Sequence, residues 1–187
     1  LGQKQHWRKF ALWENVIRTV LMIRVPAGVA ALPAGSANGR TTDNVTSLLD
    51  LYPTLVDLAG LPTRDGLDGV SLLPMLADPA AEAPRAVLST YDWGSWSVRA
   101  GEHHYIRYVD GSEELYDLSN DPEEWHNLAD TPGAESLKAS LAEHIPADPI
   151  DLPEVSLLEL LPHHVPPIRS REYFESEERA KWMERFP

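Results

Sequence analysis

The sequence predicts an α/β fold, in which a helical segment is followed by a small α+β unit with a four-stranded antiparallel sheet and one packed helix. Three observations carry this prediction. Leucines recur at helical spacing within residues 47–60, strand-like alternation begins after residue 85, and a helical pattern returns at residues 134–144. With 187 residues the chain can hold one ordinary domain or parts of two.

The helix of the first segment begins at Ser47, a favourable N-cap, and Asp50 completes a capping-box-like start. Gly60 is a natural C′ residue, and Pro53 is expected to distort the second turn. A second short helix is expected at residues 71–77. The leucines at helical spacing are Leu48, Leu51, Leu55 and Leu58.

Other elements follow from local patterns. An apolar strand is expected at residues 20–25, before Pro26. Asp110-Gly111 is a strong hairpin signal. Asn120-Asp121-Pro122 is expected to end the sheet, with Asp121 as an N-cap and Glu124 at N3. The four strands of the sheet are expected at residues 86–91, 96–99, 104–109 and 114–118, and the helix at 134–144 is expected to pack across them.

These patterns divide the chain into three parts. Residues 1–78 form the first part, 85–146 the small sheet subdomain, and 147–187 a proline-rich tail with a terminal helix near residues 170–186. The stretch Pro79 to Pro84 is the expected linker.

Composition excludes several function classes. The net charge of −13 argues against a nucleic-acid surface, and the lack of cysteine excludes disulfides and thiolate metal sites within the chain. No run approaches the ~20 apolar residues that a membrane helix needs. Against this acidic background the first 24 residues are basic, with a single acid, Glu14. Their cations are Lys4, Arg8, Lys9, Arg18 and Arg24.

Three segments resemble the sulfatase family of the alkaline-phosphatase-like superfamily, in the order expected for its C-terminal part. They read LGQKQHWRKF at residues 1–10, VTSLLDLYPTLVDLAGLP at 45–62 and SEELYDLSNDPEEWHNLA at 112–129. The pattern is closest to iduronate-sulfatase-like members. The resemblance implies that residues 1–78 end a large sulfatase-type α/β domain, with the sheet subdomain after it.

The resemblance also implies a chemistry. A formylglycine nucleophile and a calcium ion act on the sulfate ester in this family, and both are expected to depend on residues upstream of Leu1. We therefore expect no metal site in this chain and no activity from it alone. Within Trp7-Arg8-Lys9, Lys9 matches the family's sulfate-binding lysine, and His6 is a weaker catalytic candidate. Lys4 is expected to be a solvated surface charge.

The expected substrate is a sulfated small molecule or sugar, such as a glycosaminoglycan. Trp93 could stack on a sugar, and Arg99 could pair with a carboxylate or sulfate, although Arg99 could equally brace the sheet. The chain departs from the family at Arg18-Thr19-Val20, where Arg-Val-Pro is usual.

Two other functions remain open. One is a phosphodiesterase or phosphonate hydrolase of the same superfamily, and the other is a truncated product that serves only as an interaction module. For the complete enzyme the resemblance implies a periplasmic, extracellular or lysosome-like location.

Overall fold

The computed structural model describes residues 4, 11–26, 28–32, 39–80, 85–91 and 94–147. The chain divides into two compact units. The first contains Leu1–Arg18, Leu88–Val98 and Glu102–Pro187, and the second contains Thr19–Val87 and Arg99–Gly101. Residues 11–18 therefore belong with most of the sheet. The domain limits expected from the sequence stay a prediction, and the helix expected at 170–186 lies outside the described residues.

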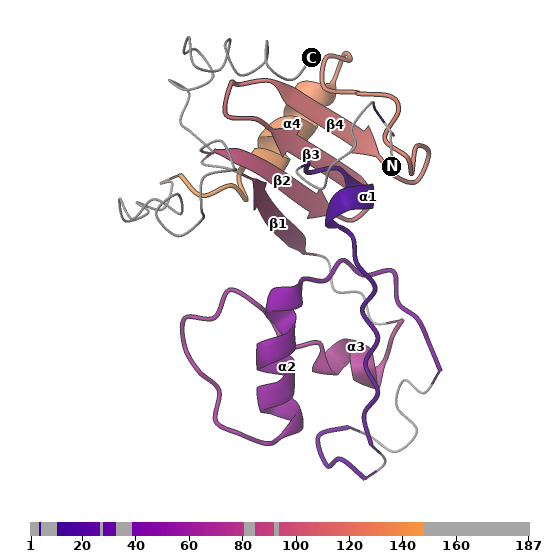
Figure 1. The fold of residues 1–187 in the computed structure, drawn as a ribbon, viewed down its shortest axis with the longest axis vertical. Helices are drawn as coiled ribbons and strands as arrows, with labels where there is room; N and C mark the ends of the chain where they lie inside the picture. Colours follow the sequence, from indigo (N-terminus) through magenta and orange to yellow (C-terminus); the bar gives the residue numbers. More distant parts are fainter. Residues whose placement is uncertain are drawn as a thin grey trace, which may run out of the picture. The chain divides into compact units, whose positions relative to one another are not determined.

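A four-stranded sheet forms the centre of the first unit (Figure 1). Its strands are adjacent in the order in which they follow along the chain, and β3 and β4 pair antiparallel, with His104 opposite Tyr116. The strands are β1 Ala86–Tyr91, β2 Ser95–Ala100, β3 His103–Arg107 and β4 Glu113–Asp117. The expected sheet is confirmed, with strand ends shifted by at most two residues.

The turn between β3 and β4 forms at the predicted dipeptide. Gly111 has a φ of 86°, a left-handed conformation that glycine adopts without a Cβ clash. The Ser112 amide donates to Asp110 Oδ1 at 2.9 Å, and the Tyr108 amide donates to the Ser112 carbonyl at 2.9 Å. These bonds close the hairpin and fix its register.

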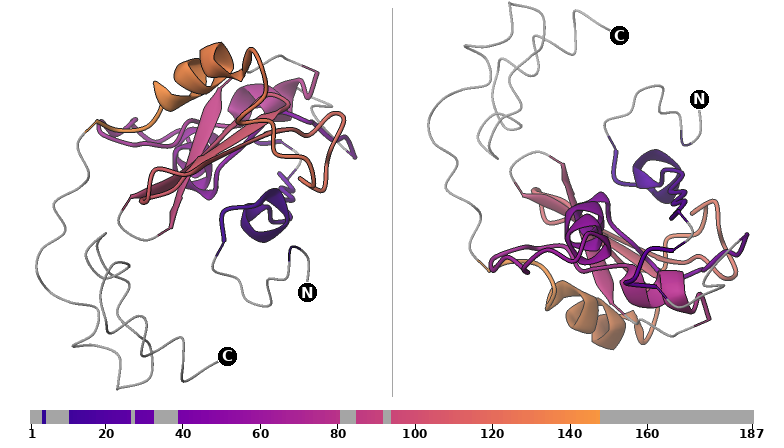
Figure 2. Two further views of the ribbon diagram at one scale, coloured as in Figure 1. Left: turned by 90° about the horizontal axis from the view of Figure 1, so that it is seen from above. Right: turned by 90° about the horizontal axis from the view of Figure 1, so that it is seen from below.

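The β3–β4 hairpin presents a different set of side chains to each face, because side chains alternate along a strand. Figure 2 shows α1 (Glu14–Ile17) and α4 (Ala134–Ala142) on opposite faces of the sheet. Ile106 and Tyr116 pack with Leu12 in the core on the α1 side. The opposite face carries Tyr105 and Leu115, which are 1% and 2% exposed. Helix α4 ends at Ala142, two residues before the predicted end.

In the second unit, a 3-10 turn, η2 (Leu48–Asp50), leads into α2 (Leu51–Leu58), and α3 (Leu73–Ala77) packs against α2. The capping box between Ser47 and Asp50 forms as predicted. Asp50 is fully buried and also accepts hydrogen bonds from the Val70 amide at 2.9 Å and from Arg85 Nη1 at 2.7 Å. Breaking such a buried pair typically destabilises a protein by about 3–5 kcal/mol. Asp50 therefore holds three separate segments of this unit together.

Gly69 lies against the backbone of η2. A Cβ atom at this position would stand 2.1 Å from the Leu49 carbonyl oxygen, so only glycine fits. The distortion expected at Pro53 is confined to the 3-10 turn that precedes it, and α2 continues to Leu58. Proline is tolerated there because it lies in the first turn of α2.

Two expectations about local structure are wrong. Residues 20–25 do not form a strand, and Val20 and Met22 are 77% and 86% exposed. A strand needs a neighbouring strand for its backbone hydrogen bonds, and the described residues supply none there. The predicted helical start at Asp121 is instead a turn, because Glu124 adopts a left-handed φ of 57° and Asp121 Oδ2 accepts from the His126 amide at 2.7 Å.

Two of the leucines at helical spacing lie at the surface. Leu48 and Leu55 are 59% and 63% exposed, whereas Thr54 and Val56 on the same helix are buried. Among the described residues, no helix is both long and apolar enough to cross a membrane.

Candidate active site

Three of the four predicted site residues, Lys9, His6 and Trp93, lie outside the described residues, so their roles stay predictions. The fourth, Arg99, lies in β2 and is half-buried. Its Nη1 donates a hydrogen bond to the carbonyl of Gly101, in the turn that follows the strand. The structure therefore gives Arg99 a bracing contact and leaves its proposed anion pairing as a prediction.

Lys4 is not the solvated charge that the sequence suggested. Its side chain is only 15% exposed, and its ammonium lies 4.8 Å from the centre of the Trp13 ring and 4.3 Å from that of Tyr116. It donates to the Tyr116 hydroxyl at 2.9 Å. Burial lowers the pKa of Lys4, while nearby carboxylates, Glu114 first, act in the opposite direction. Lys4 thus anchors the start of the chain to β4, because cation–π contacts and a hydrogen bond replace its hydration.

Glu114 is the acceptor that organises this anchor. Its Oε2 accepts from Trp13 Nε1 at 2.8 Å and from the Tyr116 hydroxyl at 2.6 Å, and its Oε1 accepts from the Tyr108 hydroxyl at 3.1 Å. Burial raises the pKa of both tyrosines, and the Glu114 carboxylate raises each further. Both phenols therefore remain protonated and continue to donate to Glu114 at neutral pH.

Glu124 connects the sheet to the start of α1. Its Oε2 accepts from the backbone amide of Glu14 at 2.9 Å, and its Oε1 contacts His104 Nδ1. The other ring nitrogen of His104, Nε2, lies 2.6 Å from Ser97 Oγ. Glu124 has a left-handed φ of 57°. Such a conformation typically costs a residue other than glycine about 1–3 kcal/mol, and the contacts of the Glu124 carboxylate must offset that cost.

Ser97, His104 and Glu124 have the order of a hydrolytic triad: hydroxyl, imidazole, carboxylate. All three are buried, with exposed fractions of 0%, 0% and 2%. No substrate can reach the Ser97 hydroxyl in this arrangement, so the three residues connect β2, β3 and the turn after β4 rather than form a nucleophilic site.

No local sequence pattern predicts these clusters. Glu124 follows His104 by 20 residues, and Tyr116 follows Lys4 by 112. The alternation of β3 and β4 was the one available clue, because it assigns His104, Glu114 and Tyr116 to a single face.

The described part of the chain contains no group of three or more His, Asp or Glu residues that could hold a metal ion. Oxygen ligands from several side chains are what calcium requires. The described residues therefore do not fit a calcium site.

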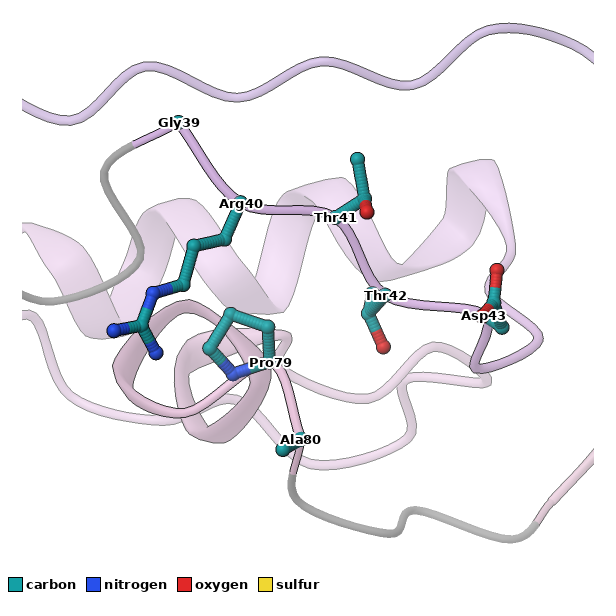
Figure 3. A pocket seen from close by; sticks show the side chains of 7 residues that line it. All are labelled: Gly39, Arg40, Thr41, Thr42, Asp43, Pro79 and Ala80. Atoms are coloured by element: carbon teal, nitrogen blue, oxygen red, sulfur yellow. The ribbon is translucent and has the colours of Figure 1, made fainter.

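An open hollow of about 510 Å³ lies in the second unit and is shown in Figure 3. Its lining offers one cation, Arg40, one carboxylate, Asp43, and two hydroxyls, and it includes no histidine to transfer a proton. The hydroxyls are those of Thr41 and Thr42, and the remaining lining residues are Gly39, Pro79 and Ala80. These side chains do not form a catalytic constellation.

The family described as N-sulphoglucosamine sulphohydrolase, C-terminal, matches residues 2–148 of this chain. A sulfatase of Formosa agariphila is 33% identical over 145 residues, which cover 75% of this chain and 27% of that protein. Arylsulfatase K of Homo sapiens is 30% identical over 142 residues, or 68% of this chain and 25% of that protein. The chain therefore spans about a quarter of the length of these curated relatives.

Among solved structures, the phosphonate monoester hydrolase of Silicibacter pomeroyi matches 59% of this chain and 26% of its own, with a TM-score of 0.50. The two sequences are 22% identical, so this similarity concerns the fold alone.

Proposed function

This chain belongs to the N-sulphoglucosamine sulphohydrolase C-terminal family, and on that premise we propose that it is the C-terminal part of a sulfuric ester hydrolase. The family match over residues 2–148 is the observation that carries the proposal. The substrate is proposed to be a sulfated sugar, because the family description refers to a sulfated amino sugar. A periplasmic, extracellular or lysosome-like location is part of the same proposal.

The proposed overall reaction is hydrolysis of the sulfate ester: the S–O bond to the alcohol breaks, and the alcohol and inorganic sulfate are released. A formylglycine supplied by residues before Leu1 would be the nucleophile, and calcium ligands are proposed to lie there as well. Sulfate offers only oxygens to bind, so cationic donors from this chain would contribute by stabilising the charge on those oxygens.

Lys9 is the proposed sulfate-binding residue, with His6 as a weaker candidate near it and with Trp93 and Arg99 on the substrate side. Lys4 is held by Tyr116, and Trp13 is held by Glu114. The chain is thus attached to β4 both before and after Lys9 in the sequence.

The test is hydrolysis by the complete enzyme of an aryl sulfate, compared with an aryl phosphonate monoester and an aryl phosphate diester. The proposal expects the highest kcat/KM for the sulfate. A preference for either phosphorus ester would favour the phosphonate hydrolase or phosphodiesterase alternative instead. If the complete protein hydrolyses none of the three, the interaction-module alternative gains support.

The 187-residue chain by itself is expected to be inactive on the aryl sulfate, with or without added calcium, because a bound cation cannot replace the missing nucleophile. Turnover by a pure sample of the chain, lost on Lys9→Ala, would contradict this.

A further inference from the structure

Glu124 stands in a conformation and an environment that do not suit glutamate. Its φ of 57° lies in the left-handed region, and only 2% of the residue is exposed. Glycine or asparagine is the usual residue at such a φ, and a carboxylate is rarely buried without partners. Strained conformations of this kind persist where surrounding contacts hold them. The contacts of the carboxylate therefore indicate what the residue does.

Both oxygens of the carboxylate have partners from other segments. Oε1 contacts His104 Nδ1 in β3, and His104 in turn lies against Ser97 of β2. Oε2 accepts from the amide of Glu14, the first residue of α1, at 2.9 Å. Glu124 thus links the most buried part of the sheet to the backbone at the start of α1.

Two further carboxylates hold the residues on either side of Glu14. Trp13 Nε1 donates to Glu114, and Asn15 Nδ2 donates to Glu123 Oε2, both at 2.8 Å. Glu124 binds the backbone itself, through the amide of Glu14. A side-chain contact leaves the main chain free to shift with the rotamer, whereas the bond to the Glu14 amide fixes the main chain itself.

The position of this bond in the sequence connects it to the proposed chemistry. Glu14 follows Lys9 by five residues, so the span between them can extend at most ~18 Å. A displacement of the Glu14 backbone would therefore change the region that Lys9 can reach. Reaction rates respond to such displacements: a catalytic group misplaced by ~1 Å can lower the rate by ~100-fold.

We propose that Glu124 is a positioning residue: it fixes the backbone at Glu14 and thereby limits where Lys9, five residues earlier, can lie. The expected effect on catalysis rests on the proposed sulfatase function, whereas the fixation of the Glu14 backbone does not. Glu124 itself contacts neither the substrate nor the reacting atoms.

The test uses the complete enzyme and two variants at this position. Glu124→Gly removes the carboxylate and relieves the backbone strain, because glycine adopts a φ of 57° readily. Glu124→Gln retains an oxygen that can accept from the Glu14 amide and serves as the conservative variant. The matched control is Glu102→Gly, the same substitution at an exposed residue in the turn between β2 and β3.

Two measurements are made on each protein: amide hydrogen exchange of the peptide that contains Glu14, and the kinetics of aryl sulfate hydrolysis. For Glu124→Gly we expect faster exchange in that peptide and a ~10- to 100-fold lower kcat, with KM within ~3-fold. Glu124→Gln should recover most of the lost kcat, and Glu102→Gly should match the wild type in both measurements.

Unchanged exchange in Glu124→Gly would overturn the proposed fixation of the backbone. Faster exchange with unchanged kcat would overturn the positioning role, as would a rise in KM alone. If the complete enzyme does not hydrolyse aryl sulfate, the proposed function is wrong. The exchange measurement would still decide whether Glu124 fixes the backbone at Glu14.

Discussion

Glu113 and Glu114 are consecutive in β4, yet they bind segments on opposite faces of the sheet. Glu113 accepts from Lys138 Nζ of α4 at 2.8 Å and from the Tyr105 hydroxyl. Glu114 accepts from Trp13, just before α1. Strand alternation is the cause, because successive side chains leave the backbone in opposite directions. Two adjacent carboxylates thus attach two helices that lie more than a hundred residues apart in the chain.

The Glu113–Lys138 pair should make stability depend on pH. The Lys138 hydrogen bond, followed by that of Tyr105, lowers the pKa of Glu113 below its usual value. A carboxyl group with a lowered folded-state pKa contributes stability above its unfolded pKa of ~4.3, and this contribution is lost as the pH falls through the folded value. We expect Lys138→Gln to lose less stability than the wild type between ~pH 6 and ~pH 3.

Urea unfolding midpoints at the two pH values measure this difference. Glu135→Gln is the control, because Glu135 also binds Lys138 at 2.8 Å but its side chain is 85% exposed. That variant should retain the wild-type pH dependence. Equal pH dependence in Lys138→Gln and the wild type would contradict the role of Lys138 in lowering the pKa of Glu113.

Lys4 should contribute to stability, although it lies near the end of the chain. Lys4→Met keeps much of the aliphatic stem but removes the hydrogen bond to Tyr116 and both cation–π contacts. We expect a loss of about 1–2 kcal/mol in the free energy of unfolding. Arg18→Met, which changes an exposed cation, should stay within about 0.5 kcal/mol of the wild type. Similar unfolding curves for the two variants would contradict the anchoring role of Lys4.

Lys9 should affect the chemical step in the complete enzyme. Lys9→Ala is expected to lower kcat by ~100- to 1,000-fold and to raise KM by much less, because the lost interaction strengthens in the transition state. Arg18→Ala is the control, since it removes an exposed positive charge from the same basic region, and it should change kcat by less than ~3-fold. Lys4 cannot serve as the control because it is partly buried. If the Lys9 and Arg18 variants behave alike, Lys9 is only part of a basic surface.

The exposed leucines of η2 and α2 should bind an apolar dye in the isolated chain. Replacing both Leu48 and Leu55 by lysine should reduce dye fluorescence by about half or more, because both side chains are largely exposed. Ala59→Lys adds a lysine at the end of the same helix without removing a leucine and should leave the signal near that of the wild type. Equal fluorescence in all three proteins would mean that the dye binds elsewhere.

Local patterns in the sequence were sufficient to predict the sheet, its hairpin turn, the capping box and α4. Each depends on residues within a few positions of one another, such as Ser47 with Asp50 or Asp110 with Gly111. The strand expected at residues 20–25 failed because an apolar run specifies a strand only where a neighbour can pair with it.

The long-range contacts were not accessible in this way. Lys4 seemed solvated because nothing near it in the sequence provides a partner, and its aromatic contacts come from Trp13 and Tyr116. Glu124 suited the third position of a helix by local pattern, but the structure uses it for a buried bond between distant segments. Such choices depend on which faces of the fold meet, which a single sequence specifies only indirectly.

The close approach of Gly69 to the Leu49 carbonyl has a consequence for how this region can evolve. Leu49 is four residues before Pro53, so an ordinary residue at position 53 could donate its amide to that carbonyl, and proline cannot. The backbone that Gly69 touches is therefore set partly by Pro53. Substitutions at the two positions should be epistatic: replacing Pro53 would alter the space at Gly69, and relatives that lose one should tend to have changed the other.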